Sequence, residues 1–148
     1  MNERPVCTVD FDNVLAFESV QNTGWIVMGT GALKPIKVIH DLVREKHREG
    51  FEIHCVTFRS KGPDIVEAEN FIKEHNLPIV KVHGTDQKSK TPILKKLNSQ
   101  LHIDDSLSVC LGAIAENIDC LFIDFGQLKD ESQKELASNL DRVIVQLD

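Results

Sequence analysis

The sequence predicts a three-layer α/β fold, in which helices cover both faces of a parallel β-sheet. Short apolar runs typical of strands alternate with segments of helical periodicity along the chain, and this alternation favours a parallel sheet. The 148 residues are about the usual size of one domain, and the chain contains no repeat, low-complexity stretch or linker. We therefore expect a single domain covering residues 1–148.

The elements follow from the spacing of apolar residues and from the residues that start and end them. The predicted strands cover residues 6–11, 51–57, 78–82, 101–103 and 120–125, with residues 143–147 as a further candidate. The predicted helices cover residues 33–50, a segment from 63 onward, a segment from 91 onward, 106–116 and 131–140. Gly50 is typical of a helix C-terminus, and Pro92 is typical of a first helical turn.

Composition and charge exclude several classes of protein. An apolar fraction of 41% and a charged fraction of 27% are typical of a globular protein, and a formal net charge of −6 excludes non-specific coating of nucleic acid. No apolar run has the length of a signal peptide or a membrane span. The four cysteines form no C-x-x-C pair and are expected to be buried free thiols rather than disulfides or zinc ligands. We therefore expect a cytoplasmic protein.

Acidic residues follow two of the predicted strands. Asp10 and Asp12 come after the apolar run PVCTV, and Asp104 and Asp105 come after LHI. Ligands of parallel sheets bind at the carboxyl ends of the strands, so both pairs are expected at one edge. An oxygen-rich cluster of this kind suits Mg²⁺, whereas zinc prefers Cys and His. The alternative is that the acids cap a surface loop and the N-terminus of the helix beginning near Ser106.

Other polar side chains are candidates for binding a phosphate. Thr57 ends the strand IHCVT, and Arg59 two residues later could pair with a substrate phosphate. Lys88 and Lys90 precede the helix that leads to the Asp104 strand, where a lysine could offset carboxylate and phosphate charge. The alternative for each lysine is a solvated surface position.

The order of these motifs resembles that of the haloacid dehalogenase (HAD) superfamily, in the form of a small, capless, phosphatase-like member. The matching segments are VCTVDFDNV, IHCVT, a lysine and LHIDD, which together span residues 6 to 105. The resemblance implies a Rossmann-like core and a phosphatase that uses Mg²⁺. The second acid often precedes Gly in this family, and here Asn13 follows it. Asparagine tolerates the left-handed conformation that the turn requires.

The resemblance also assigns roles to the strand-end residues. It implies that Asp10 is the nucleophile that forms an aspartyl-phosphate, and that Asp12 is the general acid whose backbone carbonyl also binds Mg²⁺. It implies that Thr57 binds the phosphoryl group and that Lys90 is the motif lysine, with Lys88 as the rival.

For the metal, the resemblance implies that Asp104 or Asp105 holds Mg²⁺ directly while the other supports it. The predicted metal site therefore comprises Asp10, Asp12, Asp104 and Asp105.

Members of this superfamily often carry a cap domain, for which this chain has little room. Of the 44 residues between Asp12 and Thr57, the predicted helix and strand leave only about residues 13–31, enough for a short flap. We expect an open site that accepts a large substrate, such as a nucleotide, a polynucleotide end or a phosphoprotein. Trp25 in the flap could stack on a base or sugar, or could instead be a packing anchor. The alternatives are a small-metabolite phosphatase and a non-catalytic module that binds metal and phosphate. The oligomeric state is not predicted.

Overall fold

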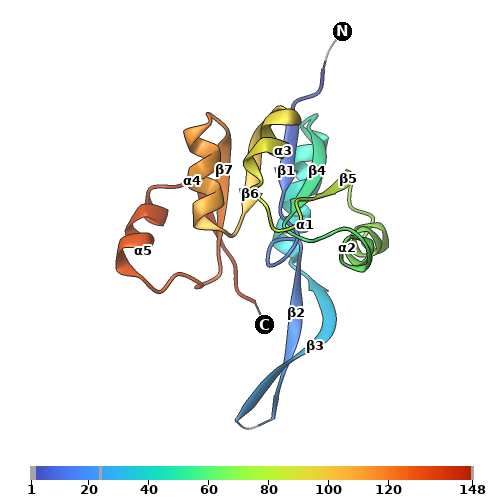
Figure 1. Cartoon of the computed structure of the whole chain (residues 1–148), viewed down its shortest axis with the longest axis vertical. Coiled ribbons are helices and arrows are strands. Elements are labelled where there is room, and N and C mark those ends of the chain that lie inside the picture. The colour runs from blue at the N-terminus through green and yellow to red at the C-terminus, as the bar shows by residue number, and fades with distance from the viewer. Residues whose placement is uncertain (1–2, 24, 148) are drawn as a thin grey trace.

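The computed structural model describes residues 3–23 and 25–147 and contains one large sheet and one hairpin (Figure 1). The strands are β1 Val6–Val9, β2 Ala16–Thr23, β3 Ile26–Pro35, β4 Glu52–Thr57, β5 Ile79–Gly84, β6 Ser99–Asp104, β7 Asp119–Asp124 and β8 Arg142–Ile144. The helices are α1 Lys37–Arg48, α2 Pro63–Glu74, α3 Thr91–Lys96, α4 Leu107–Ala115 and α5 Glu131–Ser138. All six predicted strands are present in the large sheet.

The six-stranded sheet has the order β5-β4-β1-β6-β7-β8, and every neighbouring pair is parallel. The chain therefore leaves β1 at the centre, adds strands on one side, and returns across β1 to add strands on the other. Such a reversal places the loops after β1, β4 and β6 together at the carboxyl edge of the sheet, where α/β folds bind ligands.

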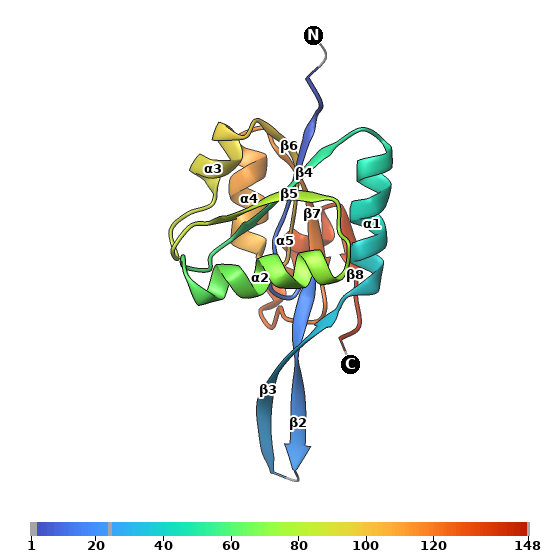
Figure 2. The same cartoon turned by 90° about the vertical axis from the view of Figure 1, so that its right-hand side faces the viewer.

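Two layers of helices cover the sheet, as the alternating pattern predicts. One apolar cluster packs α1 and α2 against one face, through residues such as Ile39, Val43 and Phe71. A second cluster packs α3, α4 and α5 against the other face, through Leu94, Cys110 and Ala137. Figure 2 shows α1 on the opposite side of the sheet from α3 and α4. The three-layer α/β prediction is confirmed.

The chain around α1 differs from its predicted boundaries. The predicted helix begins at Leu33, but residues 33–35 belong to β3 and α1 begins at Lys37. The apolar side chain of Leu33 fits helical spacing as well as a strand, so periodicity could not place this boundary. The predicted end is confirmed: Gly50 has a φ of 104° and donates its N–H to the carbonyl of His47.

The hairpin of β2 and β3 occupies the segment predicted as an aperiodic flap. Its strands pair antiparallel from Ala16–Pro35 to Thr23–Ile26, so the hairpin extends beyond the predicted end at residue 31. It projects from the end of the body at which the chain leaves β1 (Figures 1 and 2). Ala16 at the base of the hairpin is buried, but Val20 and Trp25 farther out are exposed. The outer part of the hairpin therefore gives no alternating pattern to predict it from.

The four cysteines are buried and free, as predicted. No helix among the described residues is long and apolar enough to cross a membrane.

Candidate active site

A hollow of about 280 Å³ lies at the carboxyl ends of β1, β4 and β6. Its walls carry the predicted strand-end acids together with the neighbouring loop residues: Asp10, Asp12, Asn13, Thr57, Phe58, Asp104, Asp105 and Ser106. Asn13 has a φ of 62°, the left-handed conformation that the sequence predicts for this turn. The turn carries the chain from β1 into the hairpin, so the hairpin starts beside the hollow.

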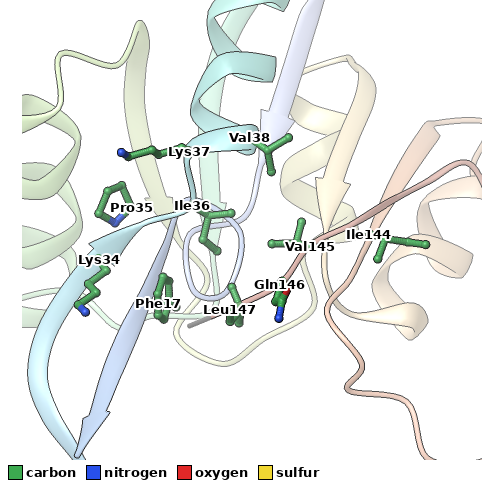
Figure 3. A pocket seen from close by; sticks show the side chains of 10 residues that line it. All are labelled: Phe17, Lys34, Pro35, Ile36, Lys37, Val38, Ile144, Val145, Gln146 and Leu147. Atoms are coloured by element: carbon green, nitrogen blue, oxygen red, sulfur yellow. The ribbon is translucent and has the colours of Figure 1, made fainter.

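A larger hollow of about 520 Å³ lies elsewhere, between the base of the hairpin and the C-terminal segment. Figure 3 shows its lining, which includes Phe17, Ile36 and Val145 together with two lysines, Lys34 and Lys37. This lining contains no carboxylate, thiol, hydroxyl or imidazole. The smaller hollow, where four carboxylates and a threonine hydroxyl meet, is therefore the candidate site.

Lys90 lies beneath the acidic residues of the hollow and joins two of them. Its Nζ is 2.9 Å from Oδ1 of Asp10 and 2.7 Å from Oδ2 of Asp104, and its side chain is only 1% exposed. The ammonium group also lies 4.6 Å from the ring centroid of Phe58. Burial lowers the pKa of Lys90, but the charges of Asp10 and Asp104 outweigh burial and raise it, so the lysine stays charged.

Asp104 is held by three partners, of which His102 was not predicted from the sequence. Oδ2 accepts hydrogen bonds from Lys90 and from Nε2 of His102, both at 2.7 Å, and Oδ1 accepts one from the backbone N–H of Ser106 at 3.0 Å. Burial raises the pKa of Asp104, but the bonds to His102 and Lys90 outweigh it and lower the pKa overall. Nδ1 of His102 in turn lies 2.8 Å from the hydroxyl of Thr8, its neighbour on β1.

His102 could have been found from strand geometry. Residues two apart on a strand share a face, so His102 and Asp104 point the same way from β6. Thr8 points to that same face from β1, where it also lies 2.8 Å from the hydroxyl of Ser99. All four polar side chains are buried, so they form an interior hydrogen-bond network and not a set of surface contacts: Thr8, Ser99, His102 and Asp104.

Asp10, Asp104 and Asp105 form a group that could hold a metal ion. Each offers a carboxylate oxygen, and the three oxygens lie within 4.8 Å of one another. Burial and the charge of Asp104 raise the pKa of Asp10 well above its ordinary value. Burial, with the charge of Asp104, also raises the pKa of Asp105 to about 6. Three crowded carboxylates beside one lysine favour an added cation, and an all-oxygen donor set fits Mg²⁺.

The carboxylate of Asp12 lies outside this group and pairs with Arg59 instead. Nε of Arg59 donates to Oδ2 of Asp12 at 3.0 Å, and Nη2 donates to Oδ1 at 2.8 Å. Nη1 of Arg59 donates to Oε1 of Glu67 at 2.7 Å and to the carbonyl of Asp64 at 2.8 Å. Arg59, proposed from the sequence as a phosphate ligand, is therefore already bound by two carboxylates. Glu67 was not predicted, because nothing local marks an exposed helical glutamate as a partner of a loop arginine.

The structure separates the other predicted residues. Thr57 is buried at the end of β4, and its hydroxyl accepts the backbone N–H of Arg59 at 3.3 Å. Lys88 is exposed, whereas Lys90 is buried among the acids. Trp25 is 94% exposed on the hairpin and does not line the hollow, so its side chain is no packing anchor within the fold.

Comparisons with known proteins support the fold. No protein-family model and no curated protein matches the sequence. A solved structure named "Putative haloacid dehalogenase-like hydrolase from Bacteroides fragilis" aligns with a TM-score of 0.56 at 13% sequence identity. The alignment covers 81% of this chain and 61% of that chain. The chain therefore has the HAD-like fold, with an aspartate cluster at the carboxyl edge of its sheet.

Proposed function

We propose that this protein is a magnesium-dependent phosphatase that forms a phosphoaspartate on Asp10. The observation that carries the proposal is the buried lysine between Asp10 and Asp104 at the carboxyl edge of a HAD-like sheet. A structural ion pair needs only one acid, whereas this lysine pairs with two members of a crowded group of three carboxylates. Perturbed pKa values in such a group, inside a hollow, are typical of a catalytic site.

In the first step, one oxygen of Asp10 attacks the phosphorus of a phosphate monoester. The new Asp10 O–P bond forms as the ester O–P bond breaks, and Asp12 gives its proton to the departing alcohol oxygen. Oδ1 of Asp10 already accepts from the N–H of Phe11 at 2.8 Å and contacts Lys90, so we assign Oδ2 as the attacking oxygen.

In the second step, water attacks the phosphorus and the bond to Asp10 breaks. Asp12 takes the proton from the water, and inorganic phosphate is released. We assign the binding of the phosphoryl oxygens through both steps to the hydroxyl of Thr57, which lines the hollow, and to the ammonium of Lys90, which contacts Asp10 beneath it.

The residues present fit a magnesium ion, which when bound supplies positive charge to offset the phosphoryl oxygens. We assign Asp10 and Asp105 as its side-chain ligands. Both oxygens of Asp104 accept hydrogen bonds, whereas Asp105 forms no ion pair with any described residue. Asp104 would then hold Lys90 in place and add negative charge near the ion.

The test is hydrolysis of 4-nitrophenyl phosphate with and without Mg²⁺. We expect turnover that requires Mg²⁺ and that falls at least about 1,000-fold in Asp10→Asn, because no nucleophile remains. Asp119→Asn, the same change at an exposed position on β7, is the matched control and should leave the rate unchanged. Full activity in Asp10→Asn would exclude the phosphoaspartate mechanism. Metal binding without turnover of any ester would favour a non-catalytic binding module.

For the substrate, we propose a large phosphorylated molecule such as a nucleotide, a polynucleotide end or a phosphoprotein. The small, open hollow and the exposed Trp25 on the neighbouring hairpin support this proposal. We expect Trp25→Ala to weaken hydrolysis of a phosphorylated oligonucleotide while leaving 4-nitrophenyl phosphate unchanged.

One observation favours a small-metabolite phosphatase as the second candidate. Arg59 is paired with Asp12 and Glu67, and the lining of the hollow carries four aspartates and no lysine or arginine. Such a mouth gives little attraction to the further phosphates of a polyanion. A panel of mononucleotides, 3′- and 5′-phosphorylated oligonucleotides, phosphopeptides and sugar phosphates separates the two candidates by kcat/KM.

A further inference from the structure

Arg59 is fixed at its backbone as well as at its side chain. Its N–H donates to the hydroxyl of Thr57, and its carbonyl accepts the N–H of Asp86 at 3.3 Å. Gly84 packs against the same carbonyl so closely that an added Cβ would lie 2.6 Å from the oxygen. The loop that carries Arg59 is therefore held against the end of β5.

The guanidinium group of Arg59 is held from three sides. On one side, the two oxygens of Asp12 accept hydrogen bonds from Nε and Nη2 in a bidentate pair. On the other side, Glu67 and the carbonyl of Asp64 both accept from Nη1. Phe11, the residue between Asp10 and Asp12, is buried, and the centroid of its ring lies 4.8 Å from the central carbon of the guanidinium. The Arg59 side chain is only 15% exposed, although both of its acidic partners are 50% exposed.

This arrangement orients Asp12 rather than offering a cation to a ligand. A bidentate pair fixes the plane of a carboxylate, which a single hydrogen bond or a lysine does not. The hydrogen bonds to Glu67 and to the carbonyl of Asp64 keep the guanidinium from turning toward the hollow. The orientation of Asp12 relative to Asp10 thus depends on a residue of α2, a helix that contributes nothing to the lining of the hollow.

We propose that Arg59 and Glu67 are positioning residues, which orient the carboxyl group of Asp12 for proton transfer to the leaving group; when one oxygen of Asp12 carries that proton, Arg59 releases it and holds the other oxygen. The inference rests on the proposed function, because it takes Asp12 as the general acid. Glu67 acts only through Arg59, and Arg59 acts only through Asp12. Neither residue is assigned a contact with the substrate.

The test compares two phosphate esters that differ in leaving group. 4-Nitrophenolate departs without a proton, whereas the alcohol of benzyl phosphate requires one, so only the second ester depends on the general acid. The value of kcat/KM reports the step that releases the leaving group, so slow hydrolysis of the phosphoaspartate does not obscure it. Asp12→Asn sets the reference, with a loss of about 100-fold on benzyl phosphate and a much smaller loss on the aryl ester.

We expect the variants of Arg59 and Glu67 to lose more kcat/KM on benzyl phosphate than on the aryl ester, as Asp12→Asn does, but with smaller losses. Arg59→Ala should lose about 30-fold on benzyl phosphate and less than about 3-fold on 4-nitrophenyl phosphate. Arg59→Lys, which keeps the charge but not the fork, should fall between Arg59→Ala and the wild type. Glu67→Gln should lose about 3- to 5-fold on benzyl phosphate alone, and no more when Arg59 is already alanine.

Glu69→Gln is the matched control, since Glu69 is exposed on the same helix and forms no ion pair with any described residue. It should leave both esters unchanged. Arg59→Lys and Glu67→Gln change the chain little, so they carry the test if Arg59→Ala does not fold.

Two results would overturn the inference while the proposed function stands. One is an equal loss on both esters that lies mainly in KM, which would make Arg59 a substrate ligand. The other is an unchanged ratio of the two esters in Arg59→Lys and Glu67→Gln. A wild-type protein that hydrolyses neither of these esters nor any member of the substrate panel with Mg²⁺ would instead overturn the proposed function, and this inference with it.

Discussion

Two groups of charged side chains meet at the carboxyl edge of the sheet and differ in burial. Around Lys90, the side chains of Asp10 and Asp104 are 9% and 1% exposed. Around Arg59, the side chains of Asp12 and Glu67 are each 50% exposed. In the buried group each charge depends on its partners for stability, because an unpaired charge in the interior is costly. We call the group around Arg59 the rim group. Water can replace a lost partner there, so the ion pairs of Arg59 govern the orientation of side chains more than the stability of the fold.

Removing the buried ammonium group of Lys90 should change the free energy of unfolding more than any other substitution in the two groups. We expect Lys90→Met to lower the free energy of unfolding by about 3–5 kcal/mol, because it leaves Asp10 and Asp104 buried without their counter-ion. Urea unfolding of the metal-free protein measures the loss. Lys88→Met, at an exposed position two residues away, is the control and should stay within about 0.5 kcal/mol of wild type. Equal stability of the two variants would mean that the buried pairing does not support the fold.

Removing the histidine that supports Asp104 should cost less. His102→Leu deletes the donor to Asp104 and removes one of the two 2.8 Å partners of the Thr8 hydroxyl, which keeps Ser99. We expect a loss of about 1.5–3 kcal/mol, the usual range for a hydrogen bond to a charged group. Thr8→Val, which removes the bonds to His102 and Ser99 but none to the charged carboxylate, should lose less. Thermal unfolding of both variants tests the order, and a larger loss in Thr8→Val would contradict it.

The crowding of the buried carboxylates predicts a pH dependence. Burial raises the pKa of Asp105 to about 6, so between pH 6 and the ordinary aspartate pKa the folded protein binds more protons than the unfolded chain. A raised carboxyl pKa therefore makes this residue more destabilising as the pH rises. Asp105→Asn removes that penalty. Its stabilisation of the metal-free protein should be about 1 kcal/mol larger at pH 7.5 than at pH 5.

Comparing the variant with wild type at each pH cancels the titration of His40 and His83, whose pKa values burial lowers. Saturating Mg²⁺ should reverse the sign at pH 7.5, since the ion then stabilises only the wild-type protein. An equal effect of Asp105→Asn at both pH values would show that Asp105 ionises normally.

The rim group should show the smallest effect on stability. Glu67→Gln weakens an ion pair between a half-exposed carboxylate and Arg59, so we expect a loss below about 1 kcal/mol. Together with the expected loss of activity on benzyl phosphate, this would separate orientation from stability. A loss as large as that of Lys90→Met would remove the distinction between the two groups.

Much of this site could be predicted from the sequence because its parts are strand ends. An apolar run followed by acids places Asp10, Asp104 and Asp105 at one edge once the sheet is parallel, and the structure brings their oxygens together. The choice between Lys88 and Lys90 could not be made this way. Both lie in the loop and turn before α3, and only the packing of that segment decides which side chain is buried.

The three-layer α/β fold and the gathering of acids at one edge could be predicted from the amino-acid sequence, because apolar periodicity and the succession of strands and helices can be read along the chain. The pairing of the charges could not, because it depends on tertiary contacts. His102 supports Asp104, and Arg59 binds Asp12 and Glu67 instead of standing free for a phosphate. The hairpin could not be predicted either, because its outer part is exposed. Hydrogen bonds between residues 47 positions apart leave no mark in the sequence, because they depend on where two loops meet in space.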